Sequence, residues 1–525
     1  MGGLPGAQIN KINSSGQTVP QSATGVAAIV APCSGGGSAV TNLATSWVSP
    51  GLVQSTYTAG PLVELSAYEL DDTAGAGLPI VAVKTTTTAV GTLGSPRVVK
   101  AIASTFSASV AKTAGLDVAD DYNAVVNNSI ASPIPNALAG NVAGVLVYFT
   151  SSGVLGTSGP QYVVSLDGGN SCSDVQSMGT ATTIVPTEPN TGAPCGFTIT
   201  VGTAAQTVTA GDYLWFVTVG PRMGTADLIA ALQALYVSKL AFDLVLVHGE
   251  TSESFTSIIE AWVLTMNARG VFPTVVSNTR FKNQTPGAVE TEVAYASAVT
   301  AILAPIVGND LCVGVDGGAY VSPLSGVTKA LPTSSYVVAV CESNEVGTDP
   351  AEQDLGALGN CDIDNPQSTP AFHDEAVYNT LDTPGSNTRA TTLRSWSGES
   401  GAFITNAYLM SNPGSDYVYI QNNRTMNACC TVAFAMVRKW CSKAVPRDPK
   451  TGFILEPVAS AWERLVLKRI KRAVAGQVSG VSFKISRTDP LTGNGPQTIT
   501  CYLDDDSLAY PKKIMVNAAF VSTLT

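Results

Sequence analysis

Only two histidines occur in the 525 residues, so any histidine-based catalytic unit must use His248 or His373. His248 follows the apolar run 242–247 and stands before a glycine and a glutamate. An α/β sheet binds ligands at the carboxyl ends of its strands, which is where this order places His248. His373 lies in a polar segment without a second cluster at metal-ligand spacing. We therefore expect a polar strand end at His248, a solvated loop at His373, and a catalytic centre at neither.

Carboxylate and hydroxyl motifs give equally little support for an active site. Residues 397–401 read SGESG, which misses the G-x-S-x-G nucleophile elbow by one position. Asp504, Asp505 and Asp506 are three carboxylates in a row, and we expect a solvated turn between strands there rather than a metal site. The sequence accordingly predicts a protein that is not an enzyme and needs no metal or cofactor.

Ten cysteines are present, without a CxxC pair that would indicate zinc or thioredoxin-like chemistry. The N-terminus lacks the features of a secretory signal, so we expect reduced thiols in a protein made and assembled in a cytoplasm. Cys429 and Cys441 fall on an apolar helix face, where buried thiols are inert. Exposed thiols are candidates for late disulfides, and we expect Cys172, Cys195 and Cys361 to be of this kind.

Two amphipathic helices near the C-terminus are among the elements that position these residues. Eight apolar residues between Met426 and Cys441 recur at helical spacing and share one face. A second helix starts at Glu456 and Pro457 and runs to about Gly476. Besides its apolar face, the second helix carries positive side chains at i, i+4, i+7 and i+8. We call this set the basic stripe: Arg464, Lys468, Lys471 and Arg472.

Strand-like segments follow these helices and also open the chain. Residues 481–487 and 497–503, separated by a turn rich in Gly, Asn and Pro, predict a long-looped hairpin. Residues 7–13 and 513–522 are isolated β-rich runs, so each predicts an open edge strand. The hairpin positions of interest are Phe483, Ile485, Ile499, Cys501 and Leu503. The arm positions are Gln8, Ile9, Asn10, Lys11 and Ile12 at the start, and Ile514, Met515, Val516, Asn517, Ala518 and Phe520 at the end.

The middle of the chain predicts a mixed α/β fold, in which helices alternate with short apolar strands and cover a largely parallel sheet. The predicted helices are 225–240, 254–269 and 288–304, with Gly270 ending the second, and the strands are 242–247, 273–277, 311–315 and 336–341. Several domains are expected, because one domain is usually about 100–200 residues. The predicted division is an extended arm 1–20, an inner domain 21–40 and 345–525 ending in a strand arm, an inserted outer β-rich domain 41–221, and an α/β domain 222–344.

Charge and hydropathy limit the kinds of partner that we expect for this protein. Charged residues make up 13% of the chain and apolar residues 45%, against about 25% charged in ordinary globular proteins. A surface so poor in charge favours extensive cover by partners. The formal net charge of −11 argues against general nucleic-acid binding. No uninterrupted apolar run of about 18 residues occurs, so no membrane insertion is expected.

The order of several short segments resembles that of tail sheath proteins from contractile bacteriophages and related injection machines. The segments are 3–6 (GLPG) with the extended arm, 25–30 (GVAAIV), 349–351 (DPA) with 355–358 (LGAL), 417–420 (YVYI) with 423–425 (NRT), and 452–457 (GFILEP). The resemblance covers residues 1–40 and 222–525. Residues 41–221 show no family pattern beyond the family's habit of carrying variable inserted domains.

The resemblance implies a structural subunit that forms hexameric rings, stacked helically around a tail tube, and contracts to drive the tube through a host envelope. The implied partners are further copies of the chain, the tail tube protein, and the baseplate and tail terminator proteins. The implied location is a virion tail assembled in the host cytoplasm. We expect the two arms to exchange strands with the hairpin of a neighbouring subunit, and the basic stripe to face the tube. The alternative is a tail adhesin or surface-layer protein that recognises a cell-surface glycan through its β domain.

Overall fold

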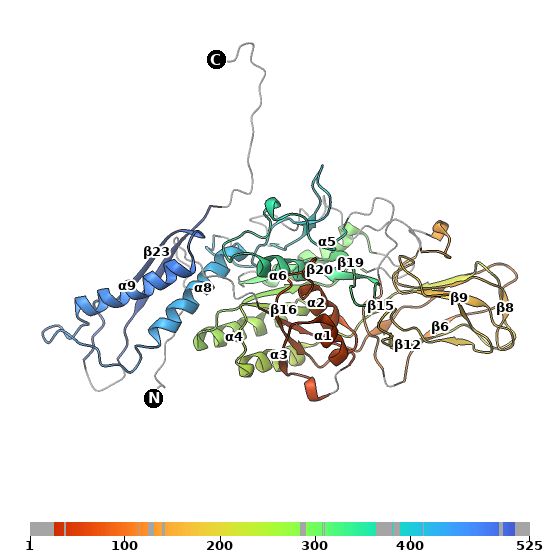
Figure 1. The fold of residues 1–525 in the computed structure, drawn as a ribbon, viewed down its shortest axis with the longest axis horizontal. Helices are drawn as coiled ribbons and strands as arrows, with labels where there is room; N and C mark the ends of the chain where they lie inside the picture. Colours follow the sequence, from red (N-terminus) through yellow and green to blue (C-terminus); the bar gives the residue numbers. More distant parts are fainter. Residues whose placement is uncertain are drawn as a thin grey trace, which may run out of the picture.

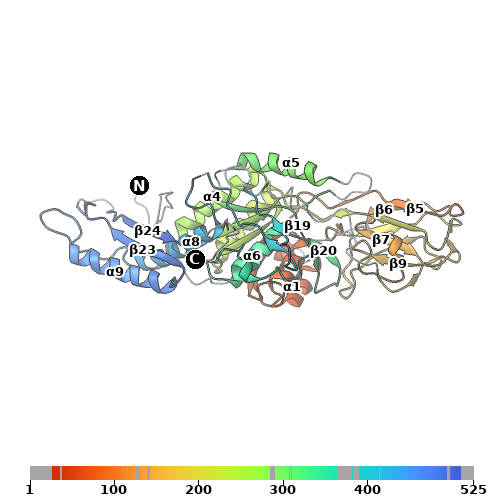
Figure 2. The ribbon, with the colours of Figure 1, turned by 90° about the horizontal axis from the view of Figure 1, so that it is seen from above.

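The computed structural model describes residues 26–509 except 36–37, 115, 124–130, 139–141, 284–289, 307, 309, 364–380, 382–388, 413 and 493–496. The fold is mixed α/β, as predicted. Three parts follow one another along the longest axis, and the view from above shows the same order (Figures 1 and 2). We call them the β-rich unit (residues 85–221), the sheet unit (26–84 and 222–425) and the C-terminal unit (426–509).

Six strands form the central sheet of the sheet unit: β1 (Ala27–Ala31), β2 (Ala44–Trp47), β3 (Ile80–Lys84), β16 (Leu244–Glu250), β17 (Thr274–Asn278) and β18 (Leu311–Gly314). Their order is β18-β17-β16-β1-β3-β2. All neighbours pair in parallel except β2, which runs antiparallel to β3 at one edge. Every residue of β1 and β17 is buried. Burial on both faces explains why β1 is apolar without alternation, whereas β17 also buries Thr274, Ser277 and Asn278.

Helices cover both faces of this sheet. One face carries α1 (Pro50–Tyr57), α2 (Pro61–Glu69) and α6 (Thr333–Ser343), and the other carries α3 (Thr225–Ser238), α4 (Glu253–Arg269) and α5 (Glu292–Leu303). Alternate side chains of β1 point into two separate cores, Ile29 into the first and Ala28 and Val30 into the second. Among the described residues, no helix combines the length and the apolar character needed to cross a membrane.

Short elements complete the sheet unit. They are η1 (Ser38–Val40), η3 (Ala304–Ile306), η4 (Gln353–Leu355), the antiparallel pair β19 (Gly317–Val321) and β20 (Thr328–Pro332), and the antiparallel pair β21 (Leu393–Arg394) and β22 (Phe403–Ile404). The β19–β20 pair carries Lys329, which is central to the site described below.

The structure corrects two expectations in this unit. Residues 336–341, predicted as a strand, lie in helix α6. A short, wholly apolar run does not distinguish a strand from a buried helix, and here burial of Val337 and Val338 against the sheet outweighs the preference of valine for strands. In addition, residues 44–84, assigned from composition to the inserted domain, supply β2, α1, α2 and β3 of the main sheet unit.

The β-rich unit consists of two larger antiparallel sheets around a shared core. One has the order β10-β9-β7-β14-β5 and the other β11-β12-β6. Phe149 of the first sheet and Phe197 of the second lie in the same core with Phe106 and Phe216. The elements are β4 (Thr92–Leu93), β5 (Arg97–Val99), β6 (Ser109–Lys112), η2 (Asn136–Leu138), β7 (Val145–Phe149), β8 (Gly153–Val154), β9 (Gln161–Ser165), β10 (Gln176–Ser177), β11 (Thr183–Ile184), β12 (Phe197–Thr200), β13 (Thr207–Val208), β14 (Tyr213–Phe216) and β15 (Thr218–Val219).

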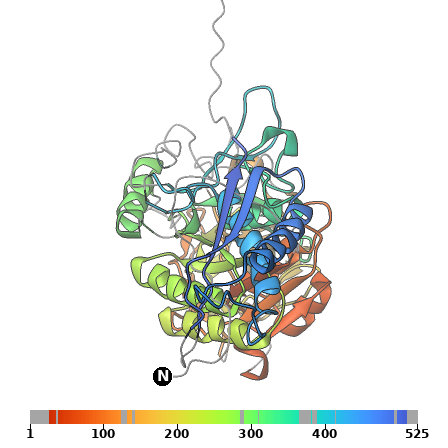
Figure 3. The same ribbon diagram turned by 90° about the vertical axis from the view of Figure 1, so that its left-hand side faces the viewer.

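The C-terminal unit packs two helices against a hairpin: α8 (Ile420–Val437), α9 (Glu456–Ala473), β23 (Val478–Ile485) and β24 (Cys501–Ser507). Figure 3 presents α9 and the β23–β24 hairpin toward the viewer. The strands pair antiparallel with Ile485 opposite Cys501 and Phe483 opposite Leu503. Asp504, Asp505 and Asp506, expected in a solvated turn, belong to β24, and Asp505 is 3% exposed.

Helix α8 is shared between two cores. Ile420, at its start, is buried in the sheet unit, whereas Cys429 and Ala433 are buried in the C-terminal unit. Polar groups fix the helix to the sheet, because Nδ2 of Asn427 donates to Oγ1 of Thr274 at 2.9 Å. The guanidinium of Arg424 donates to the backbone carbonyl of Cys341 at the end of α6. The two units are therefore joined through one continuous helix.

Gly270 confirms the predicted end of α4 and has a second role at this joint. Its φ of 84° is the left-handed conformation that favours glycine at a helix C-terminus. A Cβ added at Gly270 would lie 2.1 Å from the ring of Phe434 on α8. Phe434 also packs edge-on against Phe272, with ring centroids 6.5 Å apart. The residue that ends α4 is therefore also the one that allows α8 to approach.

Two carboxyl groups are buried between α2 and α6. Glu69 is 0% and Glu342 is 3% exposed, and none of their four oxygens accepts a hydrogen bond from a described residue. Burial, together with Asp243, raises the pKa of Glu342 to about 8, although Arg424 opposes the rise. Burial and the neighbouring Glu342 raise the pKa of Glu69 well above its usual value. Both groups therefore favour the protonated form inside the fold.

This pair predicts a stability that falls with rising pH. The folded protein retains protons that the unfolded chain releases, so stability is lost as pH rises from the usual glutamate pKa of 4.5 to about 8. Glu342→Gln cannot ionise, and we expect it to raise the thermal midpoint at pH 8 by at least about 2 °C while changing it less at pH 5. Scanning calorimetry at both pH values measures this, with the exposed Glu345→Gln as a matched control. Equal shifts at both pH values would contradict the assignment.

Candidate functional site

His248 lies in β16 at the carboxyl end of the sheet, where α/β folds form ligand sites. The residue is 8% exposed, and neither ring nitrogen has a hydrogen-bond partner among the described residues. Burial lowers the pKa of His248 to about 4, and the positive charge of Arg222 contributes while Asp121 opposes it. The imidazole is therefore neutral near pH 7. Its position agrees with the predicted strand end.

Arg222 and Asp121 are paired with each other rather than with His248. Nη2 of Arg222 donates to both carboxylate oxygens of Asp121, at 3.1 and 2.8 Å. Burial acts against the charge of Arg222, but Asp121 raises the pKa of the guanidinium above its usual value. Asp121 belongs to the β-rich unit and Arg222 to the sheet unit. The charged groups beside His248 therefore join two units and do not assemble a catalytic dyad with it.

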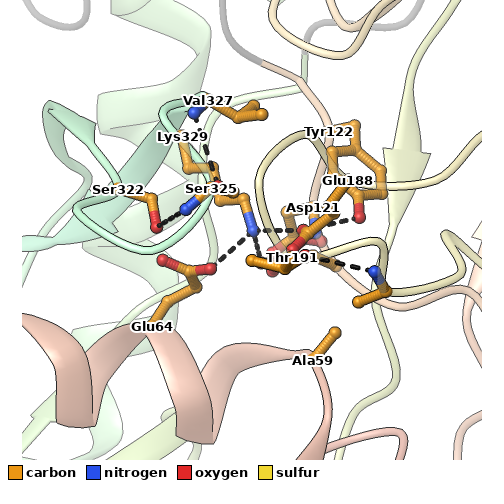
Figure 4. Close-up of polar contacts among 12 residues, drawn as sticks. Ala59, Glu64, Asp121, Tyr122, Glu188, Thr191, Ser322, Ser325, Val327 and Lys329 are labelled. Atoms are coloured by element: carbon orange, nitrogen blue, oxygen red, sulfur yellow. Dashed lines mark hydrogen bonds and ion pairs between the residues drawn. The ribbon is translucent and has the colours of Figure 1, made fainter. Parts of the chain in front are cut away.

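A second buried ion cluster lies across the same boundary (Figure 4). Nζ of Lys329 is 2.7 Å from Glu64, 2.9 Å from Asp120 and 2.6 Å from Glu188. Lys329 in β20 and Glu64 in α2 come from the sheet unit, whereas Asp120 and Glu188 come from connecting segments of the β-rich unit. The hydroxyl of Tyr122 also donates to Glu188, at 2.9 Å. One ammonium group thus contacts three carboxylates from three separate stretches of chain.

The ammonium group of Lys329 stays charged because three carboxyl groups act on it together. Burial disfavours the Lys329 ammonium, but Asp120, Glu188 and Glu64 together hold the pKa of Lys329 well above its usual value. Burial raises the pKa of both Glu64 and Asp120, and Lys329 only partly offsets this rise. With three carboxyl groups and one ammonium, the cluster favours retention of a proton on Glu64 or Asp120.

The three carboxyl groups of this cluster also have the geometry of a metal site, since one oxygen from each lies within 4.8 Å of the others. Lys329 Nζ is within 2.9 Å of all three oxygens and fills the position that a cation would take. The arrangement therefore supplies its own positive charge from the chain. The ion cluster therefore holds the β-rich unit against the sheet unit.

The hairpin residues predicted for assembly are brought together in the C-terminal unit. Phe483 and Ile485 are buried against α9, and Ile499, Cys501 and Leu503 pack at the edge of the same core. These side chains therefore hold the hairpin on its helix rather than projecting outward. Within residues 478–507, leaving out 493–496, β23 and β24 form a two-stranded sheet. In the part of the chain that the structure describes, no third strand pairs with either outer edge.

Arg487 fixes this hairpin to α9 through charged contacts that the sequence reasoning missed. Its Nε is 2.6 Å from Glu456, and its Nη1 is 2.5 Å from Glu463. Hydrogen bonds from Arg487 and Ser460 lower the pKa of Glu456 to about 2. Trp440 and Trp462 add a stacked ring pair between the α8 and α9 segments, with centroids 4.2 Å apart. The hairpin and both helices therefore form one rigid body.

The basic stripe lies on the exposed side of α9. Arg464, Lys468, Lys471 and Arg472 are all exposed, and Arg469 extends the set. None of them forms an ion pair with a residue that the structure describes. Opposite the stripe, Val466 and Ile470 are buried in the core. Leu465, beside Val466 on the same helix, is 44% exposed.

Two other groups of predicted site residues have different outcomes. The arm positions 8–12 and 514–520 lie outside the described residues, as does His373. None of the ten cysteines, all of which the structure describes, forms a disulfide. Cys195, expected to be exposed, is completely buried beside Tyr122, and burial raises the pKa of its thiol to about 12. Cys172 and Cys361 are partly exposed. Burial nevertheless raises the pKa of both thiols, that of Cys361 to about 12, which disfavours the reactive thiolate.

Sequence reasoning also missed the Lys329 cluster, although one signal was present. Glu64 lies among apolar neighbours in the first turns of α2, and Lys329 interrupts the short strand TKALP. In a chain with only 13% charged residues, such isolated charges in apolar elements indicate buried partners. Their identity depends on contacts between residues 141 to 265 positions apart, which sequence spacing does not reveal.

No protein-family model matches the sequence, and no curated protein matches it. Solved structures to which the chain is similar include the anti-feeding prophage helical sheath in its contracted state, with 11% identity, TM-score 0.45 and 100% of both chains covered. A sheath tail protein from Listeria innocua has 11% identity and TM-score 0.39, over 94% of this chain and 96% of that one. A chain of the anti-feeding prophage baseplate has 13% identity and TM-score 0.38, over 58% and 76%.

Lys329→Met is expected to loosen the β-rich unit from the sheet unit. Removing one partner from a buried ion cluster leaves uncompensated charge and destabilises a protein by about 3–5 kcal/mol. We expect a lower midpoint of thermal unfolding and faster proteolysis in the connections at residues 85–91 and 220–224. The matched control is Lys112→Met, which breaks an exposed pair worth about 0–1 kcal/mol. Equal effects of the two substitutions would contradict the role of the cluster as a joint.

Proposed function

We propose that this chain is a structural subunit of a contractile tail sheath, which polymerises around a tail tube. The observation that carries the proposal is the β23–β24 hairpin, a two-stranded sheet held rigidly on α9 with both outer edges unpaired in the described structure. An isolated two-stranded sheet is marginal in water, and its edges pair readily with further strands. The hairpin is therefore a template for strands from other copies.

The chain offers two segments to occupy those edges. Residues 7–13 and 513–522 are the β-rich runs expected as extended arms, and each lies beyond one end of the described structure. Main-chain hydrogen bonds supply the affinity in strand addition, so such contacts hardly depend on side-chain identity. Each hydrogen bond contributes about 0.5–1.5 kcal/mol net. Several such bonds in each arm hold neighbouring subunits together while their bodies rotate.

The rigid parts of the molecule support contraction by rotation of whole units. Arg487 ties the hairpin to α9, and α8 continues from that unit into the core of the sheet unit. In a subunit built in this way, a movement of the hairpin also moves the sheet unit. In the proposed assembly, hexameric rings stack helically between a baseplate and a tail terminator, and the β-rich unit lies outermost in a virion tail assembled in the host cytoplasm.

The basic stripe supports contact with an acidic tube. Four exposed cations on one helix face are unusual in a chain of net charge −11. A single surface ion pair is worth about 0–1 kcal/mol, but each ring repeats the contact six times. Because the weak contact is repeated around the ring, the ring as a whole binds the tube more tightly than one subunit does.

Charge reversal tests the stripe. Lys468→Glu with Lys471→Glu should reduce assembly on purified tubes by about tenfold or more, because like charges then face each other across the contact. Co-sedimentation with tubes measures assembly, and circular dichroism checks that the monomer stays folded. Lys450→Glu, an exposed reversal in the same unit but off α9, is the control and should assemble normally. Unchanged binding of the double variant would rule out a tube-facing stripe.

Removal of the N-terminal arm tests strand exchange. Deletion of residues 1–15 should leave a soluble, folded monomer that no longer forms tubes, because one edge of each neighbouring hairpin loses its added strand. Negative-stain microscopy and analytical ultracentrifugation measure polymer and monomer in the same preparation. A truncated protein that polymerises as the full-length chain does would show that N-terminal exchange is not essential.

A further inference from the structure

Positive charge is concentrated in one stretch of the chain beyond the basic stripe. Residues 438–487 hold twelve of the 28 Lys and Arg residues but only three of the 39 Asp and Glu residues. This stretch therefore carries a formal charge of +9, and the remainder of the chain carries −20. The stretch belongs to the C-terminal unit, which lies at one end of the elongated molecule (Figure 1). With Asp489 and the three aspartates of β24 included, that unit (426–509) carries a formal charge of +5 and the remainder of the chain −16.

A second basic group lies apart from the stripe, where α8 ends. We call Arg438, Lys439 and Lys443 the basic tip. All three are exposed, and none forms an ion pair with any residue between 26 and 509 that the structure describes. The backbone N–H groups of all three close turns on α8 and the segment after it, which fixes where the side chains start. The tip is therefore a positioned cationic surface without an internal partner.

A pocket with acidic residues at its rim, opposite in charge to the basic tip, lies in the sheet unit. A cavity of about 210 Å³ opens between the ends of α2 and α6 and the segment 350–359, and Glu352 lines it. Asp72 and Asp354 are exposed next to lining residues Thr73 and Leu355, and we call these three carboxylates the acidic rim. Most of the lining comes from segments 61–83 and 330–363, which contain no Lys or Arg. Phe403 and Ile404 of β22 complete the lining, and Arg394 pairs with Phe403 in the neighbouring strand.

The tip and the pocket of a single copy are held apart. Arg424 of α8 contacts the end of α6, close to the pocket. Fourteen residues of helix separate Arg424 from Arg438, which places the tip about 21 Å further along the axis. Because α8 is buried in both cores, it does not bend the tip back. The tip can meet an acidic pocket only on another molecule.

We infer that the basic tip of one copy docks on the acidic rim of a second copy of this chain. The inference rests on the proposed function, since it supplies one contact of the polymer, but it concerns a surface other than the hairpin and the stripe. Charge complementarity selects the partner, because the acidic part of this same chain provides the opposite charge. Long Lys and Arg side chains are suited to enter a small pocket whose rim is acidic.

Zero-length cross-linking tests the contact directly. A carbodiimide couples carboxyl groups to lysine amines only when the two are in contact. Isotopically labelled and unlabelled full-length protein are assembled together, cross-linked and analysed by mass spectrometry. We expect mixed-label peptides that join Lys439 or Lys443 to Glu352, Asp354 or Asp72. Polymers in which these lysines join only other carboxylates, or only the tube protein, would overturn the inference.

A charge swap provides an independent test. Lys439→Glu with Lys443→Glu, and separately Glu352→Lys with Asp354→Lys, should each raise the protein concentration needed for polymerisation by about tenfold, because like charges then face each other. Combining all four substitutions should bring that concentration back to within about threefold of wild type. Lys239→Glu, an exposed reversal on the sheet unit, is the control and should behave as wild type. Four substitutions that act additively, without rescue, would overturn the inference.

Failure of the sheath role and failure of the tip contact give different results. If the wild-type protein forms neither tubes nor rings, the proposed function is wrong. If the wild-type protein polymerises but the swapped variant is not rescued and the tip cross-links are missing, the sheath role stands and only the tip contact is wrong.

Discussion

Continuity of helix α8 through two hydrophobic cores is the constraint on which the rest of the structure depends. The first turns of the helix are fixed in the sheet unit by burial of Ile420 and by the Asn427–Thr274 hydrogen bond. Its later turns supply Cys429 and Ala433 to the core that also holds α9 and the hairpin. The close approach of Phe434 to Gly270 leaves no room for a side chain at position 270. Close packing at this point therefore constrains how α8 crosses the end of α4. Without this rod, the hairpin would be a separate, weakly stable element.

The β-rich unit occupies the end of the sheet that many α/β folds use for binding. In such folds the carboxyl ends of the strands leave a crevice that commonly binds substrates or cofactors. Here the β-rich unit is inserted at that end, and its Asp121, Asp120 and Glu188 meet Arg222 and Lys329. Charges that would orient a ligand in an enzyme are paired with one another across a boundary between units. Removing one partner from such a buried pair leaves an uncompensated charge, so the pairs hold the two units in one arrangement.

The sequence alone was sufficient for features that depend on local pattern. Helical spacing located α3, α4 and α9, and the left-handed position of Gly270 followed from its place after Arg269. Features that depend on distant contacts were not accessible. Residues 336–341 became a helix because the site they fill is on a sheet face, and residues 44–84 joined the main sheet through pairing with β1. Burial of Cys195 and Asp505 likewise reflects packing between segments, which the types of their sequence neighbours do not encode.

The uneven charge distribution restricts the symmetry that copies of this chain can adopt. A two-fold contact places the same surface of both partners together, so a patch at its axis meets its own image. For a molecule with a +9 segment at one end, a two-fold axis through that segment would bring like charges together without screening by an opposite partner. Contacts between unlike surfaces avoid this repulsion. Each subunit at an end of such an assembly then presents either a basic or an acidic surface that has no partner. The charge asymmetry therefore favours contacts between unlike surfaces over two-fold pairs, and in the sheath proposed above it gives the assembly a polarity.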